Sequence, residues 1–585
     1  MADDDCIATI ADILPFRAER TPRATALQHL DGDGRLREAT FAELHRDSEG
    51  FAGRLHEIGV RPRDRVAILL PNSPRWVTAY YGIMRLGAVA VPLEQGMLAD
   101  DPDRLAFALE HAEVTAAVCR PQDADAVGEL GDVPTAGPEE RADDVPPPPD
   151  VEPSDVAQIL YTSGTTGPKK GVVLTHRNII FDVRKCRTRF GVREDDCLPA
   201  LLPFHHAYPL TTTIVVPPFV GARMAVGDIR DRRARDLLSR CRPTVLIGVP
   251  RVFESMLEGI RRKAQRIARG RQLERALRLS AGVKKWTGLN AGRLIFRRLH
   301  REMFGGLQLR FAVTGGAHIA PRVLREFFAL GIPLIQGWGM SELSPVAAVQ
   351  EFDARRFYFT RFYERKAGSI GTPLDGTRIS FVPAERAGIA GDPRHGGEVV
   401  VSGEHVMQGY LKDPERTQAQ MVGDAVRSGD IGRRDGDDHL YIVGRTKHVI
   451  VLPSGKKVFP EEDLYDPLSG CDVLDEFAVR PITGPDGGEK IGIIIRPAPD
   501  AVRDAGTMGN LYDRIKREID CALEGRPGYL RQYDFCLTEW RGREFAELEK
   551  NTMGNPSPLR NPFEPDRAYS RMKDSDEPVP WAEGN

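Results

Sequence analysis

The segment YTSGTTGPKKGVVLTH, residues 161–176, decides the fold of this chain. It follows an apolar run, AQILYTSG, that predicts a strand, and it gathers hydroxyl and glycine residues into one turn before Lys170. Backbone N–H groups and hydroxyls in such a turn can surround a phosphate. The GxxxxGK[ST] spacing of a Walker A loop is absent, and no GxGxxG opens a βαβ unit here. The candidate contacts to the ligand are Thr162, Ser163, Gly164, Thr165, Thr166, Gly167 and Lys170.

The regions on either side of this loop predict an α/β fold with more than one unit. Residues 1–120 alternate helical patterns with apolar runs such as RVAILLP and AVAVPL, which indicates βα repetition around a parallel sheet. Residues 121–155 are rich in Asp, Gly and Pro and predict a surface loop. Short β segments with glycine turns at 364–444 predict a small β-rich subdomain, and a smaller α/β unit follows it. At 585 residues the chain is long enough for at least two domains and a buried pocket.

Composition and charge exclude several classes of function. Lys plus Arg total 81 against 84 for Asp plus Glu, so the net charge of −3 gives no indication of a nucleic-acid-binding protein. The eight cysteines are scattered without CxxC pairs, which predicts neither a zinc site nor a disulfide framework. The first residues, MADDDCIATI, are acidic where a signal peptide is basic, and no apolar run approaches the roughly 18 residues of a membrane span. We therefore expect a cytoplasmic protein without a transmembrane segment.

A long helical pattern between Arg251 and Phe304 is far more basic than the rest of the chain. Its central part reads RRKAQRIARGRQLERALRLSAGVKKW. Two interpretations are open: a solvated helical insertion that packs one apolar face, which we favour, or a helix that lies on a membrane surface or binds an anionic ligand.

The loop at 161–176 resembles the signature of the adenylate-forming superfamily, which includes acyl-CoA synthetases, peptide-synthetase adenylation domains and luciferases. Further resembling motifs follow in order along the chain: TGGAHIAP (314–321), QGWGMSELSP (336–345), GEVVVSGEHVMQGYLKDPERT (397–417), SGDIG (428–432) and YIVGRTKHVIVLPSGKKVFPEEDL (441–464). Within the superfamily, LPFHHAY, IVGRTKHVIVLPSGKKVFPEE and the basic insertion look like long-chain fatty-acyl-CoA synthetases.

This resemblance implies a particular architecture. The expected fold is α/β, with a large N-terminal domain of two βα layers plus a small β-rich subdomain, and a mobile, smaller C-terminal α/β domain. The implied divisions are an N-terminal AMP-binding and acyl-binding domain at 1–444, a hinge at 445–447, a mobile C-terminal domain at 448–560 and a flexible tail at 561–585. Lys447 matches the residue about which the small domain turns.

The resemblance also implies roles for individual residues. Glu342 would hold Mg²⁺ because a carboxylate is a hard oxygen ligand, Ser341 would contact the α-phosphate, and Trp338 would pack against adenine. Asp430 would accept both ribose hydroxyls, and Arg445 would contact the same nucleotide. Further nucleotide or CoA contacts, and a residue at the acyl pocket, are implied at Gly315, Gly316, Gln336, Gly337, Gly339, Lys456 and His206.

One position departs from the family pattern. Members that make adenylates carry a lysine in a stretch resembling P-K-T-x-x-G-K, whereas here the matching stretch is LEKNTMGNPSPLR, residues 548–560, with Asn555 at the lysine position. A cation there bridges the acyl carboxylate and the nucleotide, and a neutral amide cannot replace it. Loss of one oxyanion donor costs about 3 kcal/mol, so adenylation should be crippled. Thioester formation uses the other domain pose and does not need this lysine.

Four interpretations follow. The leading one is an acyl-CoA ligase that forms an acyl-CoA thioester from an acyl-adenylate supplied by a separate adenylating ligase. The others are a complete ATP-dependent long-chain acyl-CoA synthetase in which Lys550 or Lys573 substitutes, a non-catalytic acyl-adenylate-binding protein, and a ligase that loads a carrier protein. The expected cofactors are coenzyme A, acyl-AMP or ATP and AMP, and Mg²⁺. The acid is expected to be a small-molecule carboxylic acid, either a long-chain fatty acid or a bulky one.

Overall fold

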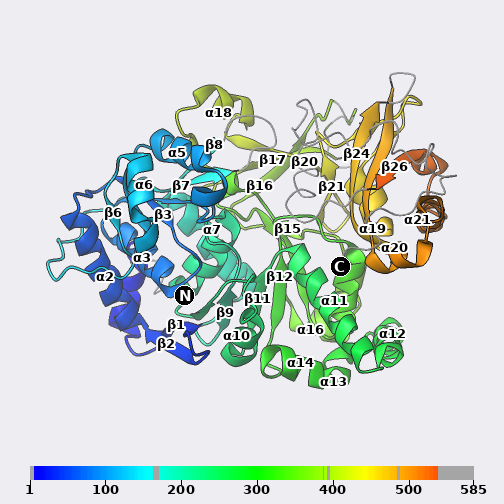
Figure 1. Ribbon diagram of the computed structural model, residues 1–585, viewed down its shortest axis with the longest axis horizontal. Coiled ribbons are helices and arrows are strands. Elements are labelled where there is room, and N and C mark those ends of the chain that lie inside the picture. The colour runs from blue at the N-terminus through cyan, green and yellow to red at the C-terminus, as the bar shows by residue number, and fades with distance from the viewer. Residues whose placement is uncertain are drawn as a thin grey trace.

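The computed structural model describes residues 6–162, 170–385, 388–389, 391, 396–483 and 488–537 (Figure 1). The sheet that contains the signature segment has a parallel centre and an antiparallel edge. Its strands, in spatial order, are β18 (Gly409–Tyr410), β8 (Lys170–Thr175), β7 (Val156–Thr162), β4 (Val89–Pro92), β3 (Arg65–Leu69), β5 (Val114–Cys119) and β6 (Thr135–Ala136).

Two further sheets of the large unit contain parallel strands. One runs β11 (Val245–Gly248), β12 (Phe311–Thr314), β13 (Leu334–Trp338), β14 (Ala348–Val349) and β15 (Thr372–Pro373), with its first three strands parallel. The other runs β2 (Leu36–Thr40), β1 (Thr25–Leu30), β10 (Arg223–Val226) and β9 (Cys197–Ala200). The loop after β13 reaches the carboxyl edge of a parallel sheet, where ligands of open α/β folds bind.

Helices cover these sheets and fill the space between them (Figure 1). In chain order they are α1 (Ile13–Arg20), α2 (Phe41–Glu57), α3 (Pro74–Arg85), α4 (Met97–Asp100), α5 (Pro102–His111), α6 (Ala124–Gly131), α7 (His176–Phe190), α8 (Ala207–Pro209), α9 (Val216–Val220), α10 (Ala234–Cys241), α11 (Pro250–Arg266), α12 (Gly270–Thr287), α13 (Gly292–Ile295), α14 (Arg297–Phe304), α15 (Pro321–Ala329), α16 (Ala354–Phe359) and α17 (Phe362–Arg365). Short single turns are η2 (Pro121–Asp123), η3 (Leu210–Val215) and η4 (Ser341–Leu343).

The signature segment ends on the first residue of a helix. Thr175, the last residue of β8, caps α7: its hydroxyl accepts from the Asn178 N–H, and the Asn178 side chain accepts from the Thr175 N–H. The Asn178 amide group also donates to the carbonyls of Glu404 at 2.7 Å and Val406 at 3.0 Å. These bonds fix the segment before β18 against the start of α7.

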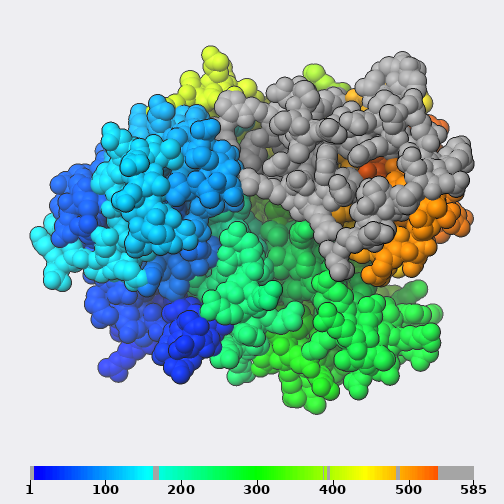
Figure 2. Space-filling model, viewed as in Figure 1, coloured from blue at the N-terminus to red at the C-terminus, as the bar shows by residue number. Residues whose placement is uncertain are grey.

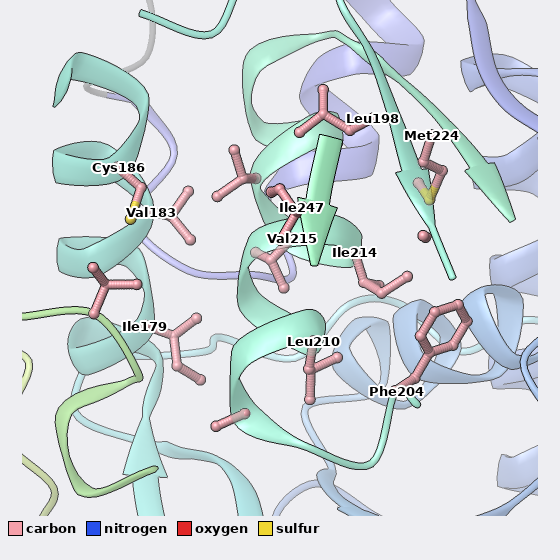
Figure 3. Packing of buried hydrophobic residues seen from close by; sticks show 14 of the residues in the cluster. Ile179, Val183, Cys186, Leu198, Phe204, Leu210, Ile214, Val215, Met224 and Ile247 are labelled. Carbon is pink, nitrogen blue, oxygen red and sulfur yellow. The ribbon is translucent and has the colours of Figure 1, made fainter. Parts of the chain in front are cut away.

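The core between the sheets is built around α7 and η3. Ile179, Val183 and Cys186 project from α7 toward Leu210, Ile214 and Val215 of η3 (Figure 3). Leu198, Met224 and Ile247 close this cluster from the neighbouring strands (Figure 3). Close packing of this kind holds the strand ends, and hence the loops that follow them, in fixed positions.

A small antiparallel sheet and a separate smaller unit follow. The antiparallel sheet contains β16 (Arg378–Val382), β17 (Gly397–Ser402), β20 (Ala425–Arg434), β19 (Met421–Val422) and β21 (Leu440–Arg445), and α18 (Pro414–Gln420) lies beside it. The smaller unit contains β22 (Ile450–Val451), β23 (Lys457–Val458), η5 (Glu461–Tyr465), α19 (Asp466–Leu468), β24 (Leu474–Thr483), β25 (Glu489–Pro497), α20 (Pro499–Ala505), α21 (Met508–Ala522), η6 (Gly528–Arg531) and β26 (Tyr533–Leu537).

The architecture confirms the predicted α/β class, with a β-rich subdomain and a smaller C-terminal α/β unit. The largest hydrophobic cluster extends from Ile7 to Leu440, and a second extends from Ile450 to Leu537, so the chain changes core close to the predicted hinge at 445–447. One expectation was wrong. Residues 121–155 are not a loop throughout, because α6 and β6 lie within them and Val127 is fully buried.

Candidate active site

The signature loop joins the two strands of an antiparallel pair. Thr162 at the end of β7 pairs with Lys170 at the start of β8, so the loop leaves and re-enters the sheet at one point. Ser163, Gly164, Thr165, Thr166 and Gly167 lie outside the described residues, and their phosphate contacts stay a prediction. The pairing places Lys170 at the base of the loop.

Lys170 lies beside a tyrosine that sequence analysis missed. Its Nζ is 4.5 Å from the centre of the Tyr410 ring, and the Tyr410 hydroxyl donates to Glu342 Oε1 at 2.7 Å. The Met407 N–H donates to the Glu342 carbonyl at 2.9 Å, which holds η4 against the segment before β18. Tyr410 lies in the quoted motif GEHVMQGY, and its position there was the signal that could have identified it.

The charges around Lys170 bring two distant parts of the chain together. Partial burial lowers the pKa of Lys170, the Glu342 carboxylate opposes this shift, and the positive charges of Arg416 and Lys447 add to it. Lys447 of the predicted hinge therefore lies within electrostatic range of Lys170. Three cations, Lys170, Arg416 and Lys447, thus lie near the two carboxylates Glu342 and Asp413, and such a group of cations suits a ligand with several negative charges.

The ends of β12 and β13 form the second part of the site. Gly316 has a φ of 81°, a left-handed conformation that favours glycine, and the Tyr208 ring would lie 3.2 Å from a Cβ at Gly315. A Cβ at Gly339 would collide with the Pro345 carbonyl, so only glycine fits there. Gln336 is buried in β13, and its Oε1 atom has no hydrogen-bond partner among the described residues. An unpaired acceptor at the wall of a cavity is a candidate ligand contact.

Asp430 is a buried carboxylate of the site with two polar partners. It lies in β20 opposite Arg445 of β21 and is 7% exposed. The Trp338 indole Nε1–H donates to Asp430 Oδ2 at 2.8 Å, and Arg445 Nε lies 3.0 Å from Oδ1. Burial raises the pKa of Asp430, whereas Arg445 and the Trp338 donor oppose the rise. Trp338 therefore positions this carboxylate as well as presenting a ring to the cavity.

A cavity of about 730 Å³ lies between the two large cores, and Lys170, Glu342 and Tyr410 are not among the described residues that line it. The large unit supplies the predicted residues Gly316, Gln336, Gly337, Trp338, Gly339, Asp430 and Arg445. The smaller unit closes the other side with residues that sequence analysis did not select, among them His448, Glu461, Tyr465, Glu476, Phe477 and Arg496. A space lined by both units can hold a ligand that reacts where they meet.

An ion-pair network joins the two units at this cavity. Arg251 at the start of α11 lies 2.8 Å from Glu476 of β24, and Arg496 of β25 binds Glu476 at 3.1 Å and Asp475 at 2.8 Å. His448 Nδ1 lies 3.0 Å from Glu461 Oε1 within the smaller unit. No quoted motif contains Arg251, Glu476 or Arg496, because their proximity depends on how the two units pack, whereas His448 and Glu461 lie in the motif at 441–464.

Other predicted positions lie away from the cavity lining. His206 is exposed at the start of α8 with its ring 4.2 Å from that of His205, and Lys456 is exposed in the turn between β22 and β23. Ser341 begins η4 next to Glu342. Asn555, Lys550 and Lys573 lie outside the described residues. The roles assigned to all these positions stay predictions.

The family model that matches this chain is described as an AMP-binding enzyme and covers residues 14–411. The chain belongs to this family. The match confirms the adenylate-forming resemblance inferred from the motifs. In the part of this AMP-binding enzyme that the structure describes, no helix combines the length and apolarity needed to cross a bilayer.

Named relatives share most of the length of this AMP-binding enzyme. A feruloyl-CoA synthase from Amycolatopsis is 29% identical over 82% of this chain and 87% of its own length. A peroxisomal long chain acyl-CoA synthetase 7 from Arabidopsis thaliana is 25% identical over 85% and 75%. A putative fatty-acid–CoA ligase, fadD11, from Mycobacterium tuberculosis is 32% identical over 55% and 56%.

Solved structures show the same fold. The o-succinylbenzoate CoA synthetase of Bacillus subtilis, solved with its acyl-adenylate intermediate, aligns with a TM-score of 0.72 and 22% identity over 93% of this chain and 98% of that one. The ATP-bound MatB of Rhodopseudomonas palustris aligns with a TM-score of 0.70 and 23% identity over 90% and 94%.

Proposed function

We propose that this chain is an acid–thiol ligase that forms an acyl-CoA thioester through an enzyme-bound acyl-adenylate. The observation that carries the proposal is the cavity lined by Trp338, Asp430 and Arg445 from one unit and by Glu461 and Phe477 from the other. The relatives named as feruloyl-CoA synthase and long chain acyl-CoA synthetase support the choice of thioester product.

The nucleotide half of the cavity suits an adenylate. The unpaired Gln336 Oε1 can accept from an adenine amino group, and the Trp338 ring offers a stacking face. Asp430 can accept from ribose hydroxyls, because Arg445 and the Trp338 donor oppose its protonation. This arrangement would hold the adenylate while its carbonyl faces the smaller unit.

Glu342 is the residue that would hold Mg²⁺. Its Oε1 accepts a hydrogen bond from the Tyr410 hydroxyl, and a carboxylate oxygen is the ligand that Mg²⁺ prefers. The ion would neutralise phosphate charge when bound. Lys170 lies against the same tyrosine and can meet a phosphate oxygen from the base of the loop.

We further propose that the adenylation half-reaction is impaired, with the acyl-adenylate supplied by another ligase. The support is Asn555, which replaces the lysine that would meet the acyl carboxylate and the triphosphate. The thioester step needs a CoA thiol to attack the activated carbonyl, with AMP leaving, and this step does not require a lysine at position 555.

A complete ATP-dependent synthetase is the second candidate, and it is supported at least as well by the relatives. Lys170, Glu342 and Asp430 provide the groups that a triphosphate, its metal and its ribose require. The acid, in either case, would carry an apolar body, as in the long-chain and aromatic acids of the named relatives.

One pair of reactions separates the candidates. The purified chain receives an acid, ATP, Mg²⁺ and CoA in one reaction, and preformed acyl-adenylate with CoA in the other, and acyl-CoA is measured by mass spectrometry. Product in the second reaction alone supports the half-reaction enzyme, and product in both supports the complete synthetase. Product in neither, with adenylate bound in a titration, supports an adenylate-binding protein, and transfer to a carrier protein but not to CoA supports a carrier-loading ligase.

A further inference from the structure

The basic α11–α14 segment and the end of α16 carry large apolar side chains exposed to water. Trp286 is 84% exposed, Leu294 77%, Phe359 65% and Leu279 61%. Such exposure is unusual, since a soluble surface rarely collects several large apolar residues in one place. We name these four residues and the exposed Leu289 the apolar corner.

Backbone contacts show that the apolar corner is one connected surface. A Cβ at Gly288, after α12, would lie 3.2 Å from the Phe359 carbonyl, and the Asn290 N–H donates to the Tyr358 carbonyl at 2.8 Å. Arg293, next to Leu294, donates to the Tyr358 hydroxyl at 3.0 Å. The end of α12, α13 and the end of α16 therefore meet where the apolar side chains emerge. This region occupies the lower right edge of the molecule (Figures 1 and 2).

Helix α12 turns its apolar residues outward together with its cations. Leu279 and Trp286 are seven residues apart and so lie on one face, and the exposed Arg271, Arg275, Arg278 and Lys285 lie on the same arc. The opposite face holds the helix to the large unit.

That inner face is held by polar contacts as well as by packing. The Ser280 hydroxyl donates to the Ala329 carbonyl at 2.6 Å, and the buried Lys284 ammonium donates to the Phe357 carbonyl. The insertion thus packs one face, as expected from the sequence. Its outer face is not simply polar, because Leu279 and Trp286 lie there.

The charge of this segment is strongly one-sided. Residues 261–301 contain fourteen Lys and Arg side chains and one acidic side chain, Glu274, although the whole chain has a net charge of −3. Glu274 pairs with Arg261. In the part of the chain that the structure describes, Arg271, Arg275, Arg278 and Lys285 have no acidic partner within 4 Å. The cations beside the apolar corner are therefore left to attract an external anion.

We propose that the apolar corner and the cations of α12 dock this protein on an anionic lipid bilayer. Trp side chains favour the membrane–water interface, and an amphipathic helix lying in that plane combines apolar insertion with attraction to anionic headgroups. A nucleic acid would use the same arginines but would gain nothing from Leu279, Leu294 and Phe359. Docking is peripheral, with α12 parallel to the surface.

The docking face is continuous with the cavity through α11. The first turns of this helix, including Arg251, Glu254 and Leu257, line the cavity, and its last turn carries Lys263 and Arg266 at the edge of the basic segment. A docked molecule would thus hold its cavity close to the bilayer. An acid that partitions into lipid would be concentrated there, although the docking itself does not depend on the proposed function.

The test uses the full chain and sedimentation with vesicles. The chain is expected to bind vesicles of phosphatidylcholine mixed with phosphatidylglycerol and to bind pure phosphatidylcholine far less, with added salt weakening the binding. Replacing Arg271, Arg275 and Arg278 by Gln should lower the affinity about a hundredfold, since each cation near an anionic surface contributes about fivefold. Trp286→Ala should lower it roughly tenfold.

Matched controls come from exposed residues elsewhere. The triple variant Arg23→Gln, Arg46→Gln and Arg235→Gln removes the same three positive charges from elsewhere on the surface. Phe107→Ser removes an exposed apolar side chain from α5. These variants should bind vesicles as the unchanged chain does. If a variant in α12 no longer shows a thermal unfolding transition, Leu294→Ser in α13 tests the contribution of the apolar corner to vesicle binding instead.

Three results would overturn the proposal. The first is equal binding to neutral and anionic vesicles. The second is an equal loss of vesicle affinity in the control and test variants. The third is vesicle binding that survives Trp286→Ala and Leu294→Ser while duplex DNA competes fully with the vesicles. The last would indicate a general polyanion site. Self-association that buries the apolar corner, seen by analytical ultracentrifugation and abolished by Trp286→Ala, would instead assign the surface to a second copy.

Discussion

At the scale of single residues, Asp430 and Glu342 should govern adenylate binding. Asp430→Ala removes an acceptor held by Trp338 and Arg445, and charged hydrogen bonds of this kind are worth about 1.5–3 kcal/mol, so adenylate affinity should fall roughly ten- to a hundredfold. Glu342→Ala should act similarly in the presence of Mg²⁺. Isothermal titration measures both. Unchanged affinity at an unchanged melting temperature would remove the residue from the site.

The raised pKa of Asp430 predicts a pH dependence. Because burial favours its neutral form, Asp430 takes up a proton at a higher pH than an ordinary aspartic acid. The protonated form accepts less well from ribose hydroxyls, so adenylate affinity should decline as the pH falls toward this pKa. The free energy of unfolding depends on pH in the opposite direction: the contribution of Asp430 is fully present below the pKa of the unfolded state and is lost as the pH rises through the raised pKa of the folded state. Asp430→Asn should flatten the affinity profile, and an unaltered profile would assign it to another group.

Asn555→Lys should create or strengthen adenylation, since the other groups that the first half-reaction requires are present in the sequence. The lysine would supply a mobile cation for the acyl carboxylate and the triphosphate, and the gain should be about a hundredfold. Acid-dependent exchange of pyrophosphate into ATP measures it, with Asn555→Gln as the uncharged control. Strong exchange by the unchanged chain would refute the half-reaction proposal.

At the scale of secondary-structure elements, the segments that carry the site could be predicted from the sequence more fully than the segments that surround it. The strand before the signature loop and the β-rich subdomain were predicted, because their residues carry turn chemistry and apolar runs in the local sequence. α6 was missed, since its segment is rich in the Asp and Gly that usually mark loops. Glu476 could not be assigned from sequence, because its partner Arg251 is brought to it by packing between distant elements.

The predicted hinge at 445–447 connects β21 to the smaller unit, so a change in its backbone should affect how that unit moves. Lys447→Pro fixes φ near −65° just after β21, so it should hold the smaller unit in one pose. Thioester turnover should collapse, by about a hundredfold or more, while adenylate still binds. Lys447→Ala is the matched control, because it removes the charge near Lys170 and leaves the backbone free. Turnover in the proline variant close to that of the alanine variant would place the hinge elsewhere.

At the scale of the whole molecule, the Arg251–Glu476 pair joins the two units across the cavity. Arg251→Glu places like charges opposite each other, and turnover should fall about two- to fivefold, as expected for an ion pair in which one partner, Arg251, is exposed. Added salt should restore it, since screening weakens repulsion. Arg251→Gln should lack this salt response. Identical salt profiles for the two variants would show that the pair has no part in turnover.

The division of the cavity lining between two cores has a consequence for how such enzymes diversify. Each of the two largest clusters is closed on its own side of the predicted hinge, so a genetic exchange in this short connection would leave both intact. Such an exchange would replace Glu461, Tyr465 and Phe477 in one step and keep Trp338 and Asp430. The two sides of the cavity lining are thus separable by one exchange, as two halves of one site.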